Sequence, residues 1–319
     1  MKVYYIGIDL GGTNIACGLV NVEGKLLLKK SCKTGAQREA GEIMADMAAL
    51  VEDVIRQSGI KKSEVAFCGI ASPGIANSDT GVIEYSCNLP SFLNFNIVED
   101  LKKRTGIPKV GLENDANCAA KGEAEAGAAK GCSTSVFITL GTGVGGGVII
   151  DGKIFHGFNF AGAELGHCVI EKDGYPCSCG RRGCWETYSS ATALCRMTRE
   201  EMEKSSESLM WAECGGDLKE VDGRTAFDAW RKGDTAAQRV LDRFTSYLAC
   251  GITNMVNIFQ PEIISVGGGI SAEGEALLAP VRAILEKEQY SRMCEKKTVL
   301  KKAELGNDAG IIGAALLWR

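Results

Sequence analysis

The sequence predicts an α/β protein built from two related domains. Short β-branched runs alternate with amphipathic segments along the chain, as in α/β architectures. A length of 319 residues exceeds what one small core needs, which favours two domains. The segment DLGGTNIACGLV, which starts at Asp9, also resembles TLGTGVGGGVII, which starts at Thr139. Each segment is typical of a strand, a glycine-rich turn with a threonine, and a return strand. The sequence therefore predicts that one strand-turn-strand unit occurs twice.

The first part of the chain contains most of the smaller domain. Residues 39–57 form an amphipathic helix, because Ile43, Met47, Leu50 and Val54 fall on one face and Gly59 follows as a stop. A short helix is expected at Val98–Thr105. Strands are expected at Val3–Asp9, Ile15–Val20, Lys25–Cys32, Val65–Ala71 and Val110–Glu113.

The second part begins with an alanine-rich helix at 116–130 and repeats the strand and turn unit at Ser135–Leu140 and Gly146–Ile150. Helices follow near Thr187–Lys204, Thr225–Lys232, Thr235–Phe259, Glu275–Lys287 and Asp308–Trp318, with strands at Glu262–Val266 and Thr298–Ala303. We expect residues 1–115 with about 300–319 to form a small N-terminal domain, and residues 116–299 to form a large one.

Composition excludes several classes of function. A net charge of −4 and a pI near 5.5 give no electrostatic reason to expect nucleic acid or an anionic membrane as a partner. No apolar run approaches a membrane span, and residues 1–8 lack the pattern of a signal peptide. Most of the fourteen cysteines stand singly in apolar contexts, which is typical of reduced thiols in a cytoplasmic protein.

One group of cysteines has the spacing of metal ligands. Cys177, Cys179 and Cys184 follow His167 closely, and three thiolates with one imidazole form a closed tetrahedral zinc site. Gly180 and Gly183 give the backbone the freedom that such a knuckle needs. A closed site leaves no position for water, so the zinc is predicted to be structural. His156, the other histidine, is interpreted as a turn or packing residue.

The glycine turns are the second chemical motif. Residues 141–146 match GxGxxG, but a strand-like segment follows instead of the helix that a dinucleotide site requires, and no P-loop is present. Either turn alone can be a simple tight hairpin. Together the tips Gly11–Thr13 and Gly141–Gly143 present two sets of backbone N–H groups suited to phosphates, and Asp9 lies beside the first to hold hydrated Mg²⁺.

The third motif is Asp115, a carboxylate between a strand end and a helix start. It can act as a base towards a substrate hydroxyl, and the helix N-terminus keeps it ionised. Its alternative role is to cap that helix, which is the commoner role when the residue is considered alone.

Eight motifs carry a resemblance to a known family: DLGGT (9–13), SPG (72–74), NLP (88–90), ENDANCAA (113–120), LGTGVGGG (140–147), GAELGH (162–167), CSCGRRGC (177–184) and GGGIS (267–271). In this order they resemble the ROK-family sugar kinases, most of all the bacterial ROK glucokinases. The resemblance implies an actin-like, hexokinase-type (ribonuclease H-like) ATPase fold of two domains, with ATP and sugar in the cleft between them.

The resemblance also implies roles for individual residues. Asp115 matches the catalytic base, and His167, Cys177, Cys179 and Cys184 match the zinc ligands. The positions that bind the sugar are Gly74, Asn88, Asn114, Asp115, Glu164, His167 and Glu186. The positions that bind ATP and Mg²⁺ are Asp9, Gly11, Gly12, Thr13, Gly141, Thr142 and Gly143, with Gly268 and Gly269 on the adenosine side. Ser91-Phe92 and Trp185 depart from the family pattern in the sugar half.

The implied activity is ATP-dependent phosphorylation of glucose at its 6-hydroxyl, in a cytoplasmic homodimer or homotetramer. An N-acetylglucosamine or N-acetylmannosamine kinase is the closest alternative, and ATP and polyphosphate are both open as phosphoryl donors. A sugar-sensing ROK repressor is disfavoured, because the first phosphate strand begins at Val3, where a repressor has a helix-turn-helix. A sugar-binding protein without activity is disfavoured because Asp115 and both phosphate turns are present.

Overall fold

The computed structural model describes residues 3–319, in which two five-stranded sheets and one three-stranded sheet are found. The first sheet has the order β3-β2-β1-β4-β8, with β1 Tyr4–Leu10, β2 Asn14–Val20, β3 Leu26–Lys33, β4 Val65–Ser72 and β8 Val110–Asn114. The second has the order β11-β10-β9-β12-β13, with β9 Ser135–Leu140, β10 Val144–Ile150, β11 Lys153–Ile154, β12 Ile263–Gly267 and β13 Val299–Lys302. The small sheet contains β5 Ile75–Asn77, β6 Val82–Tyr85 and β7 Phe95–Asn96.

The two large sheets share one strand order, which confirms that the strand and turn unit is used twice. In the first sheet β2 runs antiparallel to β1 and β3, while β4 lies parallel to β1 on its other side. In the second sheet the hairpin strands β9 and β10 are followed by the edge strand β11, and β12 is next to β9 on the opposite side. Both glycine turns therefore join a central strand to its hairpin partner.

By contacts between residues, the chain divides into two compact units. The first unit contains residues 1–137, 147–163 and 304–319, and the second contains residues 138–146 and 164–303. These bounds differ from the expected domains mainly at residues 116–137 and 147–163, which belong to the first unit by contacts. The reason is that helix α3 (Asp115–Ala126) packs against helix α10 (Ala309–Ala315) of the same unit. The division into a small and a large domain stays a prediction.

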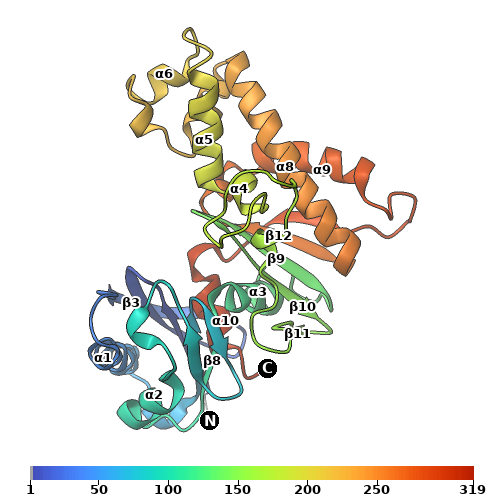
Figure 1. The fold of residues 1–319 in the computed structure, drawn as a ribbon. Helices are drawn as coiled ribbons and strands as arrows, with labels where there is room; N and C mark the ends of the chain where they lie inside the picture. The colour runs from blue at the N-terminus through green and yellow to red at the C-terminus, as the bar shows by residue number, and fades with distance from the viewer. Residues whose placement is uncertain (1–2) are drawn as a thin grey trace. The chain divides into compact units, whose positions relative to one another are not determined.

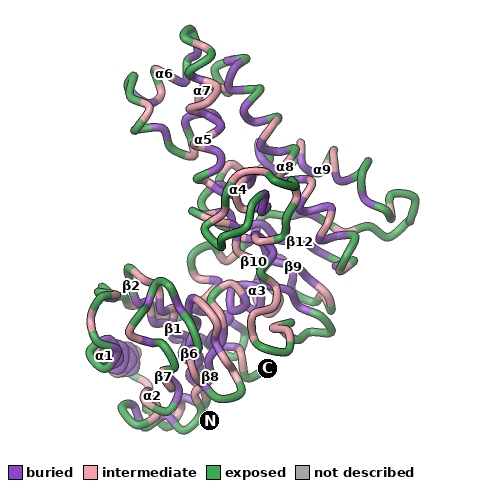
Figure 2. Tube along the Cα trace, in the orientation of Figure 1, coloured by how far each residue is buried: buried purple, intermediate pink, exposed green. Residues whose placement is uncertain are grey.

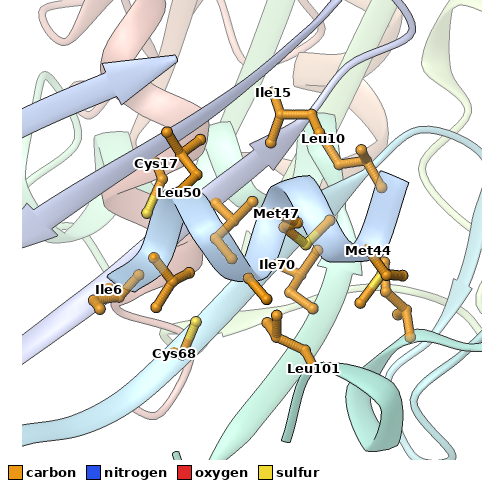
Figure 3. Packing of buried hydrophobic residues seen from close by; sticks show 14 of the residues in the cluster. Ile6, Leu10, Ile15, Cys17, Met44, Met47, Leu50, Cys68, Ile70 and Leu101 are labelled. Carbon is orange, nitrogen blue, oxygen red and sulfur yellow. The ribbon is translucent and has the colours of Figure 1, made fainter. Parts of the chain in front are cut away.

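Helix α1 (Ala40–Ser58) covers one face of the first sheet and builds the core of the first unit. Figure 3 shows Met44, Met47 and Leu50 of α1 directed at side chains of the strands, among them Ile6 and Ile70. Apart from Leu50 at 9%, these side chains are fully buried, and each contributes about 1.5–3 kcal/mol of hydrophobic free energy. Helix α2 (Ile97–Thr105) extends the same core through Leu101.

Helix α10 completes the first unit by packing with almost no space between backbones. A Cβ atom at Gly7 would overlap the carbonyl oxygen of Ile311, and one at Gly313 would overlap that of Cys118 in α3. The buried carboxylate of Glu123 in α3 then binds the segment before α10, since it accepts hydrogen bonds from the backbone N–H of Glu304 at 3.1 Å and Leu305 at 2.8 Å. The last residues of the chain are thus fixed to the first sheet and to α3.

The second unit is mainly helical (Figure 1). Its helices are α4 Glu186–Ser189, α5 Ala191–Met202, α6 Met210–Glu213, α7 Thr225–Arg231, α8 Thr235–Phe259 and α9 Glu275–Glu288. Helix α8 has the predicted bounds, and buried and exposed residues alternate along it in Figure 2, as expected of a helix with one apolar face. Asp234 caps α8 by accepting from Ala237 N at 2.8 Å, and it also accepts from the Ser208 hydroxyl and the Leu209 N–H.

Short 3₁₀ turns connect these elements: η1 Lys62–Glu64, η2 Pro90–Phe92, η3 Leu165–His167, η4 Leu218–Glu220, η5 Gly269–Glu273 and η6 Gly306–Asp308. Some predicted helices differ from the observed ones. The helix expected at 187–204 is interrupted at Ser190, whose extended backbone and side chain cap α5 through Ala193 N. The alanine-rich helix ends at Ala126, and the last helix spans only Ala309–Ala315. Over residues 3–319 we find no helix that combines the length and apolar character needed to cross a membrane.

Candidate active site and metal centre

The junction of β8 and α3 places Asp115 at the start of a helix without using it as the cap. Asn114 is the capping residue, because its Oδ1 accepts from Ala116 N at 2.9 Å and Asn117 N at 3.2 Å. Asp115 is the first residue of α3, and its exposed carboxylate accepts from Ala116 N at 2.8 Å. Asn114 therefore caps the helix, which was one of the two roles considered for Asp115. The Asp115 carboxylate lies at the helix N-terminus, which favours its ionised form.

Three further candidate sugar residues lie in the first unit. The Asn114 Nδ2 donates to the carbonyl of Gly74 at 3.1 Å, so the SPG turn and the start of α3 are held together. The same amide nitrogen has a second hydrogen that can serve a ligand. Asn88 lies against the first glycine turn, since a Cβ atom built on Gly12 would be 3.5 Å from the Cβ of Asn88. The first glycine turn and one candidate sugar residue are thus neighbours.

The first glycine turn follows β1. Its backbone is closed by a hydrogen bond from Gly11 N to Asn14 O at 3.0 Å, and the Thr34 hydroxyl donates to Gly11 O at 2.6 Å. Burial raises the pKa of Asp9 above its usual value, and the charge of Lys29 partly opposes this. A partly buried carboxylate beside such a turn is suited to hold a hydrated divalent cation, which would favour its ionised form.

The second glycine turn, between β9 and β10, is tied to helix α4 by Glu186. The Glu186 Oε2 accepts from Val144 N at 3.0 Å, and a Cβ atom at Gly143 would overlap this oxygen. Only a glycine at position 143 therefore lets the carboxylate reach the turn. In the sequence analysis Glu186 is a candidate sugar-binding residue. Its contact with the backbone of the second glycine turn was not predicted.

A cavity of about 310 Å³ extends from the same turn within the second unit. Gly141, Thr142 and Gly269, which were predicted to bind ATP, line one part of it. The start of α5 borders the turn, because Ala191 N donates to Gly141 O and the Thr192 hydroxyl to Thr142 O, both at 2.8 Å. Sequence reasoning assigned no role to the remaining lining residues: Leu140 and Ile270, which lie in two of the motifs, and Ala191, Asp222, Gly223, Arg224, Ala272 and Glu273, which lie in none.

The predicted metal ligands do lie together. One ligand atom each from His167, Cys177, Cys179 and Cys184 falls within 4.8 Å of all the others. The Sγ atoms of Cys179 and Cys184 are 3.7 Å apart, and Cys177 Sγ is 3.5 Å from His167 Nδ1. Tetrahedral zinc with its usual bond lengths requires about 3.8 Å between two sulfurs and about 3.5 Å between sulfur and nitrogen. The donor set and its spacing therefore fit zinc.

A tight knuckle presents these thiols. Cys177 N donates to Arg181 O at 2.9 Å and Gly180 N to Cys177 O at 3.0 Å. Gly180 and Gly183 have φ values of 86° and 77°, as predicted for turns that favour glycine. Because Nδ1 of His167 faces the sulfur atoms, Nε2 is the ring nitrogen left for another partner. Glu186 joins this cluster to the second glycine turn, since its Oε1 lies 3.9 Å from Cys177 Sγ and its Oε2 accepts from Val144 N.

Each predicted site residue can be assigned to one of the two units. Those in the first unit are Asp9, Gly11, Gly12, Thr13, Gly74, Asn88, Asn114 and Asp115, and those in the second are Gly141, Thr142, Gly143, Glu164, His167, Cys177, Cys179, Cys184, Glu186, Gly268 and Gly269. Glu164 directly precedes η3, and its carbonyl accepts from His167 N at 3.1 Å.

Comparison with known proteins gives consistent matches over the whole length. A model of the ROK family matches residues 5–319. The glucokinase of Thermotoga maritima is 39% identical over 315 residues, which cover 98% of this chain and 96% of that protein. The glucokinase of Halalkalibacterium halodurans is 35% identical over 317 residues, covering 98% and 94%. The crystal structure of a ROK glucokinase from Streptomyces griseus with glucose and AMPPNP superposes with a TM-score of 0.81 at 32% identity, covering 98% of both chains.

Proposed function

The chain belongs to the ROK family, and from this premise we propose that it is a glucokinase, which transfers the γ-phosphoryl group of ATP to the 6-hydroxyl of D-glucose. It is a sugar kinase with the actin-like, hexokinase-type fold of the solved ROK kinases. The observation that carries the choice of sugar is the full-length similarity to glucokinases at 34–39% identity. An N-acetylhexosamine kinase is the alternative that the test below is designed to separate.

We propose Asp115 as the general base. Its carboxylate is exposed, and the capping of α3 falls to Asn114, so Asp115 is not required to complete the helix. The helix N-terminus keeps the carboxylate ionised until the attacking hydroxyl gives up its proton. Phosphoryl transfer needs positioning and charge neutralisation more than covalent chemistry, so one well-placed base is sufficient.

We propose six residues besides Asp115 as sugar contacts. Gly74, Asn88 and Asn114 belong to the first unit, and Glu164, His167 and Glu186 to the second. Support comes from the local geometry, since Asn114 retains one amide hydrogen and His167 Nε2 is directed away from the thiols. Zinc held by the cluster would fix the orientation of the His167 ring, which is a role that metals have at structural sites.

The proposed phosphate contacts are the backbone donors of the glycine turns at 11–13 and 141–143. When bound near Asp9, Mg²⁺ would neutralise phosphate charge during transfer. Asp9 would hold the hydrated ion, and Glu186 would keep the second turn in shape through Val144 N–H. The adenosine group would occupy the cavity that Gly269, Arg224 and Thr142 line, beside Gly268.

Three properties follow from the family and its sequence rather than from contacts. We propose a cytoplasmic location, a homodimer or homotetramer, and ATP rather than polyphosphate as the phosphoryl donor. Sedimentation equilibrium tests the oligomeric state, and turnover with polyphosphate in place of ATP tests the donor.

An assay of ADP release with Mg-ATP tests the choice of sugar. Glucose, mannose, fructose, N-acetylglucosamine and N-acetylmannosamine should be compared at equal concentrations, with kcat/KM as the readout. We expect the highest kcat/KM for glucose. Turnover restricted to an N-acetylated sugar would overturn the assignment to glucose, and no turnover on any sugar would overturn the kinase activity.

The variant Asp115→Ala tests the base. We expect kcat to fall by roughly a thousandfold or more, while glucose binding stays measurable by calorimetry. The matched control is Glu99→Ala, which removes another exposed carboxylate from the first turn of a helix in the same unit and should leave kcat unchanged. Wild-type turnover in Asp115→Ala would show that this carboxylate has no part in the reaction.

A further inference from the structure

The carboxylate of Glu113 occupies an unusual position next to the proposed base. Glu113 is the fourth residue of β8, is only 3% exposed, and lies two positions before Asp115. Its Oε1 accepts from Asn114 N at 2.9 Å and from Asn117 Nδ2 at 3.0 Å. A buried carboxylate costs several kcal/mol of desolvation free energy unless charge and hydrogen bonds compensate it. The Oε1 contacts tie the end of β8 to the first turn of α3, and the remaining oxygen of Glu113, Oε2, also needs a partner.

His156 satisfies that oxygen. Its Nδ1 lies 3.1 Å from Glu113 Oε2, in a part of the chain that follows β11. The segment from His156 is closed by a hydrogen bond from Gly162 N to His156 O at 3.0 Å, and the Phe160 ring lies 5.5 Å from the imidazole. The sequence interpretation of His156 as a turn or packing residue omits this contact, which joins the segment before Glu164 to the strand that carries Asn114.

We propose that His156 is a positioning residue for phosphoryl transfer, which acts through Glu113 to hold Asn114 and Asp115 in place at the start of α3. The inference rests on the proposed function, in which Asp115 is the base and Asn114 binds the sugar. A displacement of about 1 Å at a reacting group can reduce the rate by about a hundredfold, so a contact two residues away from the base can set the rate.

Other charged groups around this pair do not take the place of His156. Glu113 and His156 line a cavity of about 420 Å³ in the first unit, together with Lys121, Lys153 and Arg319. Lys121 and Arg319 are both engaged by Glu125, at 2.8 and 3.3 Å. Lys153 extends from β11 with no contact to Glu113 among the described hydrogen bonds and ion pairs. The imidazole is thus the cationic partner that the structure gives to the buried carboxylate.

The charge of His156 makes the contact dependent on pH. The hydrogen bond to Glu113 raises the pKa of His156, burial opposes this, and the negative charges of Glu113 and Asp79 add to the rise. Since the folded pKa is raised above its unfolded value of about 6.5, the added stability is complete below that value. It is lost as the pH rises through the higher, folded pKa. Above it only a neutral hydrogen bond joins the two side chains.

Nuclear magnetic resonance of the zinc-loaded protein tests the contact without relying on activity. The chain has two histidines, and His167 belongs to the metal centre, so His156 should give the one imidazole signal that titrates near neutral pH. His156→Gln should remove this signal and so assign it. Glu113→Gln should lower its pKa, because the hydrogen bond to the carboxylate and the charge of the carboxylate both raise it in the wild type. An unchanged pKa in Glu113→Gln would overturn the pairing.

Kinetics with glucose and Mg-ATP test the positioning role. We expect His156→Gln to lower kcat about ten- to a hundredfold and to raise the KM for glucose, with the KM for ATP nearly unchanged. His156→Lys, which keeps a cation, should recover part of kcat at neutral pH. The control Lys153→Gln removes a cation from the same cavity and should match the wild type.

The outcomes separate this inference from the proposed function. Wild-type kcat in His156→Gln, with Asp115→Ala inactive, would overturn the positioning role alone. An active Asp115→Ala would remove the premise of that role, while the resonance titration would still establish or refute the pair. Equal increases in the KM for glucose and for ATP, with no recovery in His156→Lys, would indicate general damage to the fold and also overturn positioning.

Discussion

Replacing Gly143 with alanine should disable the second glycine turn through one displaced carboxylate. A Cβ atom at position 143 would overlap the Glu186 Oε2, so the carboxylate has to leave Val144 N–H, which it now accepts at 3.0 Å. A hydrogen bond to a charged group contributes about 1.5–3 kcal/mol. If the turn is needed in its present shape for phosphate, the loss lowers kcat/KM by about 10- to 150-fold, since each 1.36 kcal/mol corresponds to tenfold.

The assay is steady-state ADP release with glucose and Mg-ATP, combined with a double-mutant cycle against Glu186→Ala. In the Glu186→Ala background no carboxylate is displaced, so adding Gly143→Ala should cost little more. Gly41→Ala in α1 controls for the gain of a methyl group, because no neighbour lies closer than 4.0 Å to a Cβ atom there. Wild-type kcat/KM in Gly143→Ala, or the same loss with and without Glu186, would refute this reasoning.

Three further predictions concern the metal, the packing of α10 and one helix cap. The wild-type protein should hold about one zinc ion per chain by elemental analysis, and Cys179→Ser should lose it with a lower thermal midpoint. Cys294→Ser, which changes an exposed cysteine outside the cluster, should keep the zinc. Gly313→Ala should lower the free energy of unfolding by about 1–3 kcal/mol in urea titrations, because the added methyl group has to displace the backbone of α3. An unchanged urea midpoint would contradict the close packing of α10 and α3. For Asp234, burial raises the pKa, but the N–H groups of Ala237 and Leu209 and the Ser208 hydroxyl lower it more, so the folded pKa lies below the unfolded one. The ionised cap therefore stabilises the folded protein above about pH 4. Asp234→Asn should lower the free energy of unfolding by about 1–2 kcal/mol at pH 7, and this difference should disappear as the pH falls through the folded pKa. A difference that does not depend on pH would refute the assignment of the cap.

The sequence predicts most of the fold because its strongest signals are local. The apolar stripe of α8 runs without interruption from Thr235 to Phe259, and both observed ends match the prediction. The break at Ser190 was missed because the segment on each side has a helical pattern, and only the cap of Ala193 N by the Ser190 side chain shows that a second helix begins there. The small sheet was missed since its strands are two to four residues long.

At the site, the sequence predicts contacts best where spacing in the chain decides the geometry. The predicted metal ligands are an example, since Cys177, Cys179 and Cys184 belong to one knuckle and their ligand atoms lie close to that of His167. Contacts between distant segments were not predicted, and the pairing of His156 with Glu113 is one example. Trp185, which departs from the family pattern in the sugar half, is fully buried and donates from Nε1 to Tyr247 O at 3.1 Å, so its immediate surroundings are core.

The position of α10 in the first unit has a consequence for biosynthesis. The glycine surface of β1 and β4 that receives α10 is made early, but residues 304–319 leave the ribosome only after residues 164–303 of the second unit. At 5–20 residues per second, this surface waits roughly 10–50 s for its helix. During that interval the nascent chain exposes an apolar groove, which is a target for chaperones and a point where aggregation can begin. We therefore expect the second unit to fold first and the first unit to be completed after synthesis has passed residue 315.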